Sequence, residues 1–395
     1  MISGVAVVSP LGIGARIFWE ALCAGRSAIE EIRGFDPGPA PPRLGAQVRS
    51  FAGRDFLAPR LVRRMDRLSQ MIAAAAVSAV ADAGLDDSGD ADDCGVVVGS
   101  MLGNLTEAAQ FLDRVFTKGP ALANPMLFPN LVMNAPASQI AMALQCRGPN
   151  LTVSCGEISG EVALETAVDL VRRGRCRAVV AAGGEELSEI VFQALKDFRY
   201  LSPRGRGAER SIPFDKRANG PVLGEGAAAV VVETEASARQ RGGAVRATIE
   251  HIERFTVAAR SPHLWPVPES APRVTLPARA LDAELVLCGA DSSPERDRLE
   301  LALLPRLVPA GRFVYSLAGA VGSHGSQGLS TIVAAVLALR SGTLPPLPAL
   351  EQPRPGIDFS ASRSVRRGAW SRAAVIGVAR GGAGALVELG AEASS

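Results

Sequence analysis

The chain has 395 residues, of which 47% are hydrophobic, and this composition supports a large core of two or three domains or of one duplicated α/β unit. A formal net charge of +2 with scattered arginines gives no case for a nucleic-acid partner, and six cysteines without a C-x-x-C pair favour reduced thiols in a cytoplasmic protein over a disulfide framework or metal site. The N-terminus lacks a signal-peptide pattern, and the longest apolar run is too short to cross a membrane.

Short β-branched runs alternate with Ala-rich helical patterns, which is typical of layered α/β proteins. In the first half, buried strands are predicted at 94–98 and 178–182, and an antiparallel or edge strand at 227–233. A further strand at 151–153 turns sharply through Gly156 and enters a helix at 160–173. A nucleophile often stands at such a turn, but this chain has Glu157 there.

A polar, glycine-containing segment at 237–247 is the best candidate for a join between two halves, which we place at 1–235 and 236–395. The second half repeats the alternation of strands and helices. Its predicted elements are strands at 285–287 and 314–317, helices at 296–304 (ended before Pro305) and 328–341, and a closing strand pair at 374–378 and 385–389. The proline-rich stretch at 257–278 predicts a loop.

Several motifs resemble the β-ketoacyl synthase family. The strongest is SIPFDKRANGPVLGEGAAAVVVE at 211–233, and the resemblance is carried in the same order by GVAVVSPLG at 4–12, the elbow around Glu157, GLSTIVAAVLAL at 328–339 and VARGGAGALVEL at 378–389. The resemblance implies a thiolase-like fold, a five-layered α/β/α/β/α sandwich of two similar halves. It also implies a dimer and an interface insertion in the N-terminal half.

An active member of this family needs a cysteine at the N-terminus of a buried helix, two histidines and a lysine. Aligning the motifs places Glu157 at the cysteine position, Gly289 and Ala320 at the histidine positions and Tyr315 at the lysine position. The resemblance therefore implies that no catalytic residue, cofactor or metal site is present in this chain.

Several roles for the remaining polar groups stay open. Glu157 caps its own helix, hydrogen-bonds to a partner subunit or orders water, or acts as a base. Cys155 is the residual candidate nucleophile. His324, four residues after Ala320, either reaches the site or, as the pattern favours, is a loop histidine that faces solvent or a partner; His263 is interpreted as structural or exposed.

Loss of the catalytic groups with retention of the motifs is similar to the chain length factor, the β-type subunit of type II polyketide synthases. That resemblance implies a partner, an active cysteine-containing ketosynthase, and work with an acyl carrier protein, with neither nucleic acid nor membrane involved. Members usually carry Gln at the nucleophile position, so Glu157 is a departure. The alternatives are an active decarboxylase or acyltransferase that uses Glu157, Cys155 or His324, and a homodimeric module that binds carrier proteins.

The chain length factor closes the far end of an acyl channel shared with its partner. In this sequence, LTEAAQFLDRVFTKGP at 105–120 places five apolar residues on one helix face. The candidate channel residues are Leu102, Leu105, Ala108, Ala109, Leu112, Phe116, Met126, Leu127 and Phe128. For each of them the alternative is ordinary core packing.

Overall fold

The computed structural model describes residues 1–85, 93–205, 207–259, 261, 264–266, 274–275, 281–355 and 363–392. Its first six-stranded sheet has the strand order β2-β1-β8-β7-β5-β6. The strands are β1 (Ile2–Ser9), β2 (Gly12–Ile13), β5 (Cys94–Gly99), β6 (Asn150–Val153), β7 (Ala178–Glu185) and β8 (Gly226–Glu233). β8 runs antiparallel to both neighbours, whereas β5 is parallel to β7 and β6. β6 is therefore an edge strand.

The second six-stranded sheet has the order β10-β9-β16-β15-β11-β12. Its strands are β9 (Thr248–Val257), β10 (Val274–Thr275), β11 (Leu285–Cys288), β12 (Phe313–Tyr315), β15 (Arg372–Val378) and β16 (Ala383–Gly390). Across the second sheet, β9, β16 and β15 are antiparallel to their neighbours in turn, and β15, β11 and β12 are parallel to one another. This is the same sequence of directions as across β1, β8, β7, β5 and β6 in the first sheet. The two halves thus share one topology, while the boundary at 235/236 stays a prediction.

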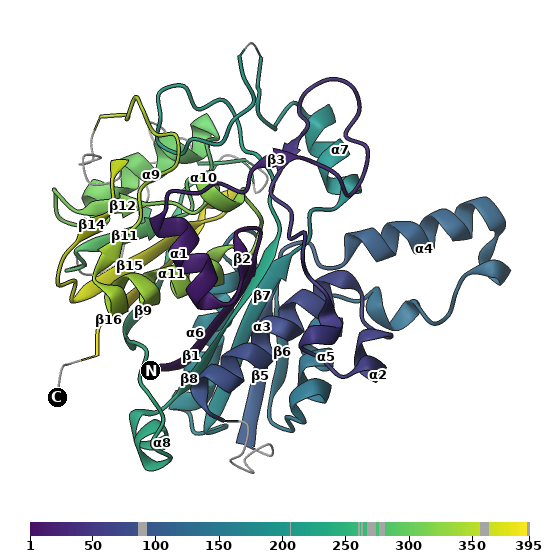
Figure 1. The fold of residues 1–395 in the computed structure, drawn as a ribbon, viewed down its shortest axis with the longest axis horizontal. Coiled ribbons are helices and arrows are strands. Elements are labelled where there is room, and N and C mark those ends of the chain that lie inside the picture. The colour runs from purple at the N-terminus through teal and green to yellow at the C-terminus, as the bar shows by residue number, and fades with distance from the viewer. Residues whose placement is uncertain are drawn as a thin grey trace.

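Helices cover both sheets and separate them (Figure 1). α3 (Arg67–Ala83) and α5 (Ala135–Leu144) pack on the outer face of the first sheet. α6 (Ser159–Arg172) and α11 (Gly328–Ser341) lie between the sheets and contact strands of both. The buried leucines of α9 (Pro294–Leu307) join the same core as β11. The five-layered α/β/α/β/α arrangement is confirmed.

Further helices, short strands and turns flank the two sheets. They are α1 (Ala15–Cys23), α2 (Pro59–Val62), α4 (Leu105–Lys118), α7 (Glu189–Asp197), α8 (Glu235–Gln240), α10 (Ala318–Val321), the two-residue strands β3 (Glu30–Glu31), β4 (Leu44–Gly45), β13 (Thr343–Leu344) and β14 (Arg366–Arg367), and 3-10 turns at Gly53–Asp55, Pro120–Leu122, Phe128–Asn130 and Arg380–Gly382. In the described part of the chain, no helix has both the length and the apolar character needed to span a bilayer.

The contact between β1 and α3 shows how the sequence specifies the layers. Ala6 and Val8 belong to the core under α3, whereas Val5 and Val7 belong to the core between the sheets, as alternation along a strand requires. A Cβ on Gly4 would lie 2.1 Å from the carbonyl oxygen of Ala79, so glycine allows α3 to approach the strand closely.

Three predicted boundaries were wrong. α9 does not end before Pro305 but continues to Leu307. A proline in the last turn removes only one backbone hydrogen bond of the helix, and this cost is offset because Leu304 and Leu307 become buried. The strand predicted at 314–317 ends at Tyr315, since Leu317 already caps α10. The predicted loop at 257–278 contains β10, which pairs with β9, and much of the remainder lies outside the described residues.

α4 projects away from the body of the molecule (Figure 1). None of its residues is buried, and Leu112 and Phe116 are exposed on it. The segment that follows exposes further large apolar side chains, which are Leu122, Met126, Phe128, Val132 and Met133. Large apolar side chains are therefore exposed both on α4 and along the segment that follows it.

Candidate functional site

The turn between β6 and α6 holds Glu157 in the lining of a cavity that is described below. Gly156 adopts a positive φ of 62°, which lets the chain reverse before α6 begins. The largely buried Glu157 carboxylate accepts a hydrogen bond of 3.1 Å from the backbone N–H of Arg380, and its other oxygen lies 3.4 Å from Arg380 Nε. In the described residues no α6 amide donates to Glu157, so the predicted cap of its own helix is wrong.

Arg296 is a buried cation in the same site. Its Nε lies 3.1 Å from Glu300 Oε1, and its Nη1 lies 3.4 Å from Asp291 Oδ2. The guanidinium also stacks over the Trp265 ring at 5.0 Å. Burial disfavours its charge, but Asp291, Glu300 and Glu157 outweigh that effect and raise the pKa of Arg296 above its ordinary value. Arg296 is therefore charged and fully paired.

The Arg296 guanidinium occupies the space in which a side chain at position 289 would lie. A Cβ at position 289 would lie 2.0 Å from Arg296 Nη2 and 2.7 Å from its Cζ. Any side chain at 289, an imidazole included, would have to displace the guanidinium from its two carboxylates. The absence of a side chain at 289 is thus coupled to the presence of Arg296.

Arg380 completes a layer of cations and aromatic rings. Its guanidinium carbon lies 4.9 Å from the Tyr200 ring centroid and 5.5 Å from that of Trp265. The indole Nε1 of Trp265 donates a 3.1 Å hydrogen bond to the Tyr200 hydroxyl. Stacking of this kind contributes most where the cation is withdrawn from water. Arg380 and Arg296 were missed in the sequence, where Arg380 stood in a worn glycine-rich loop and Arg296 looked like an ordinary helix residue.

A cavity of about 150 Å³ opens beside these charges, with apolar residues such as Leu102, Val191 and Leu195 on one wall and Glu157, Arg296, Arg380 and His324 on the other. His324, in the loop between α10 and α11, therefore reaches the site and does not simply face solvent, whereas a contact with a partner stays a prediction. Burial lowers the pKa of His324 to about 4, so the imidazole is neutral near pH 7. Its buried Nδ1 has no hydrogen-bond partner in the described residues. His263 lies outside them.

Two buried carboxyl groups lie near these charges: Glu185 lines this cavity, and Glu161 lines a smaller hollow that also contains Glu157 and Arg296. Glu185 accepts hydrogen bonds from the Ser100 hydroxyl and the Met101 backbone, yet burial raises its pKa to about 7. Burial likewise raises the pKa of Glu161, in the first turn of α6, to about 7. Both groups are partly protonated at neutral pH, which lowers the charge that the site must hold.

The other degenerate positions lie apart from this cavity. Gly289 lines a smaller hollow together with Glu157 and His324, whereas Tyr315 and Ala320 are buried in the core and line neither space. Burial raises the pKa of Tyr315 above its ordinary value, as expected for a phenol among apolar side chains. Cys155 packs half-buried against a small apolar cluster. The described residues contain no group of three or more acidic, histidine or cysteine side chains able to hold a metal ion.

The candidate channel residues do not gather in one cavity of this chain. Leu102 lines the cavity beside Glu157, and Met126 lines a separate groove. Phe128 packs edge-on against Phe111 at 6.4 Å while remaining mostly exposed. Leu105, Ala108, Ala109 and Leu127 are half-buried. Their assignment to an acyl channel stays a prediction, because the described residues do not bring them together in one cavity.

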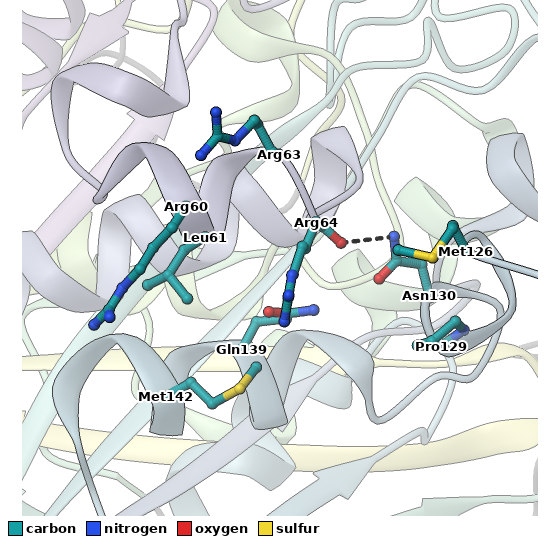
Figure 2. A pocket seen from close by; sticks show the side chains of 9 residues that line it. All are labelled: Arg60, Leu61, Arg63, Arg64, Met126, Pro129, Asn130, Gln139 and Met142. Carbon is teal, nitrogen blue, oxygen red and sulfur yellow. Dashed lines mark hydrogen bonds between the residues drawn. The ribbon is translucent and has the colours of Figure 1, made fainter.

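A second hollow, of about 880 Å³, lies between α2, α5 and the 126–130 segment (Figure 2). Arg60, Arg63 and Arg64 line it together with Met126 and Met142. Its wall is fixed by a 3.0 Å hydrogen bond from the Asn130 side chain to the Arg64 carbonyl, which Figure 2 marks. The buried Gln139 Oε1 in this wall has no hydrogen-bond partner in the described residues. The groove therefore presents positive charge beside apolar surface.

Comparison with known proteins gives consistent relatives. Residues 1–238 match the family described as "Beta-ketoacyl synthase, N-terminal domain". The chain is 30% identical over 377 residues to "3-oxoacyl-[acyl-carrier-protein] synthase 2" of Coxiella burnetii (91% of this chain, 90% of that protein). It is 30% identical over 381 residues to "Granaticin polyketide putative beta-ketoacyl synthase 1" of Streptomyces violaceoruber (91% and 90%). The solved structure "The ishigamide ketosynthase/chain length factor" superposes with a TM-score of 0.89 at 22% identity (99% and 98%).

The ion pairs of Arg296 with Asp291 and Glu300 can be tested by replacing the arginine. Arg296→Met leaves Asp291 and Glu300 buried without a cation, so we expect a loss of about 3–5 kcal/mol in the free energy of unfolding. Burial already raises the pKa of Glu300, and without Arg296 the folded-state pKa of this carboxyl rises further above its unfolded value. The loss in the free energy of unfolding is therefore smallest at a pH below the pKa that this carboxyl group has in the unfolded chain, and it grows as the pH rises toward 8.

Denaturant melts of wild type and variant at pH 5 and pH 8 measure this effect. Arg298→Met, an exposed arginine two residues along α9, is the matched control and should change stability by no more than about 0.5 kcal/mol. An Arg296→Met deficit that does not depend on pH would contradict the assigned pairing.

Proposed function

This chain belongs to the β-ketoacyl synthase family, and from that membership we propose that it is a non-condensing, chain-length-factor-type subunit. It pairs with an active cysteine-containing ketosynthase and shapes the channel in which an acyl chain grows. The likeness of the fold to a ketosynthase/chain length factor supports the architecture that this role needs.

The occupied site is the observation that carries the proposal. A condensing enzyme of this family needs a thiolate at the elbow and imidazoles near it. Here the elbow carries a carboxylate engaged by Arg380, and Arg296 fills the space beside Gly289. Charged pairs held by stacking and burial leave no nucleophile positioned for acyl transfer.

One observation favours a second candidate, a decarboxylase that uses Glu157 with His324. Both side chains line the same cavity, and the imidazole is neutral. The contact with Arg380 weighs against it, because the backbone amide and the guanidinium of Arg380 already engage both oxygens of the Glu157 carboxylate. Cys155 and the homodimeric carrier-binding module gain no such support.

The surface available for a partner lies on one side of the first half. β6 is an edge strand with unpaired backbone groups on its outer side, and Leu151 on it is exposed. The apolar face of α4 and the 122–133 segment are also exposed. Obligate partners in general bury roughly 2,000 Å² or more, with apolar centres, which suits this surface.

The groove of Figure 2 supports the carrier-protein part of the proposal. One relative's name includes an acyl carrier protein as the substrate carrier. A carrier protein presents its acyl group on a phosphate-linked arm, and guanidinium groups such as those of Arg60, Arg63 and Arg64 bind phosphate in a bidentate manner. The methionines beside them offer adaptable apolar contact.

Absence of self-acylation is the first expected outcome. Incubated with an acyl carrier protein that bears a radiolabelled acyl group and then run on a denaturing gel, the purified chain should remain unlabelled, because Glu157 replaces the nucleophile. Adding malonyl carrier protein and measuring released carbon dioxide tests the decarboxylase alternative in the same samples. Label that is lost on Cys155→Ala, or carbon dioxide release that is lost on Glu157→Gln, would refute the non-catalytic role.

Pairing through the β6 edge is the second expected outcome. Leu151→Arg should abolish the 1:1 complex formed on co-expression with a cysteine-containing synthase from the same gene cluster, because a charge would be buried at the joint. Val365→Arg is the matched control, since both side chains are 40% exposed in the isolated chain. Size-exclusion chromatography measures the complex, and equal behaviour of the two variants would exclude this edge.

Control of chain length by α4 is the third expected outcome. Phe116→Ala should lengthen carrier-bound products by roughly one or two two-carbon units, because packed interiors refill a gap only partly. Conversely, Ala108→Trp or Ala109→Trp should shorten them. Phe116 is 82% exposed in the isolated chain, so the substitution should cost this chain little stability.

Mass spectrometry of products from the reconstituted pair measures the distribution of chain lengths. Phe198→Ala on the end of α7, with a ring 80% exposed, is the matched control and should leave products unchanged. If Leu105, Ala108, Leu112 and Phe116 variants all assemble, turn over and give wild-type lengths, α4 does not measure the chain.

A further inference from the structure

The turn that leads from β5 into α4 is held by one buried carboxyl group. Glu185 is the last residue of β7, and only 2% of it is exposed. Its Oε1 accepts hydrogen bonds from the Ser100 hydroxyl at 3.0 Å and from the backbone N–H groups of Met101 and Leu102. The Leu102 side chain lines the cavity beside Glu157. One oxygen atom therefore fixes three successive residues at the base of α4.

The next residue, Glu186, holds α4 itself. Its Oε1 accepts the backbone N–H of Thr106, the second residue of the helix, at 3.1 Å. The N–H groups in the first turn of a helix have no partner within the helix, so a carboxylate from another element can take one of them. On the other side, Leu187 donates its backbone N–H to the buried Glu225 at 3.1 Å. The segment that carries the two glutamates is thus tied to the core as well as to α4, and α7, the helix that follows it, also contacts α4.

Burial decreases along α4. Residues 105–109 are half-buried, whereas Leu112 and Phe116 are exposed, and no residue of the helix is fully buried. Phe111 packs against Phe128, but that ring belongs to the segment that follows α4. At a rise of 1.5 Å per residue the helix is about 21 Å long, so a tilt of about 10° at its base would move Phe116 by roughly 3 Å. A small change in the hydrogen bonds at the base would therefore be amplified at the exposed end.

We propose that Glu185 and Glu186 are positioning residues that set the direction of α4, and through it the length of the acyl chain made by the reconstituted pair. They act as hydrogen-bond acceptors for the chain's own backbone. An uncharged acceptor of the same shape should therefore replace the carboxylate, whereas an apolar side chain should not. The effect on the direction of α4 can be measured on the isolated chain, and the effect on chain length rests on the proposed function.

Limited proteolysis of the isolated chain tests the effect on α4. Arg114 and Lys118 on the helix are exposed, and trypsin cuts after basic residues. Glu186→Met has no acceptor for the Thr106 N–H, so we expect about fivefold faster cleavage at these two sites. Glu186→Gln keeps an oxygen that can accept this N–H and should be cleaved at the rate of wild type.

Two controls separate a local effect from general unfolding. Glu189→Met removes an exposed carboxyl group three residues along and should be cleaved like wild type, and cleavage after the exposed Arg173, at the end of α6, should not change in any variant. Glu185→Met should act in the same direction as Glu186→Met, and the two Glu186 variants decide the test if Glu185→Met does not fold. Equal cleavage of Glu186→Met and Glu186→Gln in α4, or a rise after Arg173 as large as that in α4, would overturn the positioning role.

Mass spectrometry of carrier-bound products from the reconstituted pair tests the effect on chain length. Glu186→Met should spread the products over more than one length, because Phe116 would no longer have one fixed place, whereas Glu186→Gln should give the wild-type distribution. Phe116→Ala is assayed beside them. A shift with Phe116→Ala but none with Glu186→Met would overturn this inference and leave the proposed function standing. No shift with either variant would refute the chain-length role of α4 and this part of the inference with it.

Discussion

The guanidinium of Arg296 occupies the volume that a side chain at position 289 would need, and Asp291 and Glu300 surround it. These groups depend on one another. Removing the cation leaves two buried carboxylates unpaired, and adding a side chain at 289 displaces the cation from both. A buried network of this kind resists single substitutions, because each change leaves another buried charged group without its partner.

The site also joins the two halves of the fold. Glu157 comes from the turn before α6, whereas Arg380 and Arg296 come from the second sheet and its helix α9. Asp297, next to Arg296, accepts the backbone N–H of Phe214 at 2.8 Å and so fixes a loop of the first half against α9. At this site the contact between the two halves is held by ion pairs, hydrogen bonds and stacked rings.

The sequence was sufficient for the elements whose signal is local. Alternating or continuous apolar runs predicted β5, β7, β8 and β11, and the elbow around Gly156 was placed correctly. Arg296 and His324 could not be placed in the same way. Arg296 stands at the start of a helix like many surface arginines, and its burial follows from Gly289, seven residues earlier, having no side chain. His324 reaches the cavity only through the packing of the loop between α10 and α11.

The residues around Arg296 and the residues of α4 differ in how deeply they are buried. The groups around Arg296 are buried and interdependent, so substitution there costs stability first. α4 itself has no buried residue, and the chain's own core does not rest on Leu112 or Phe116. If a partner covers this helix as proposed, side chains on α4 can vary in size while the fold is retained. A family built this way would change the length of its product by substitution on α4 and keep its degenerate site unchanged.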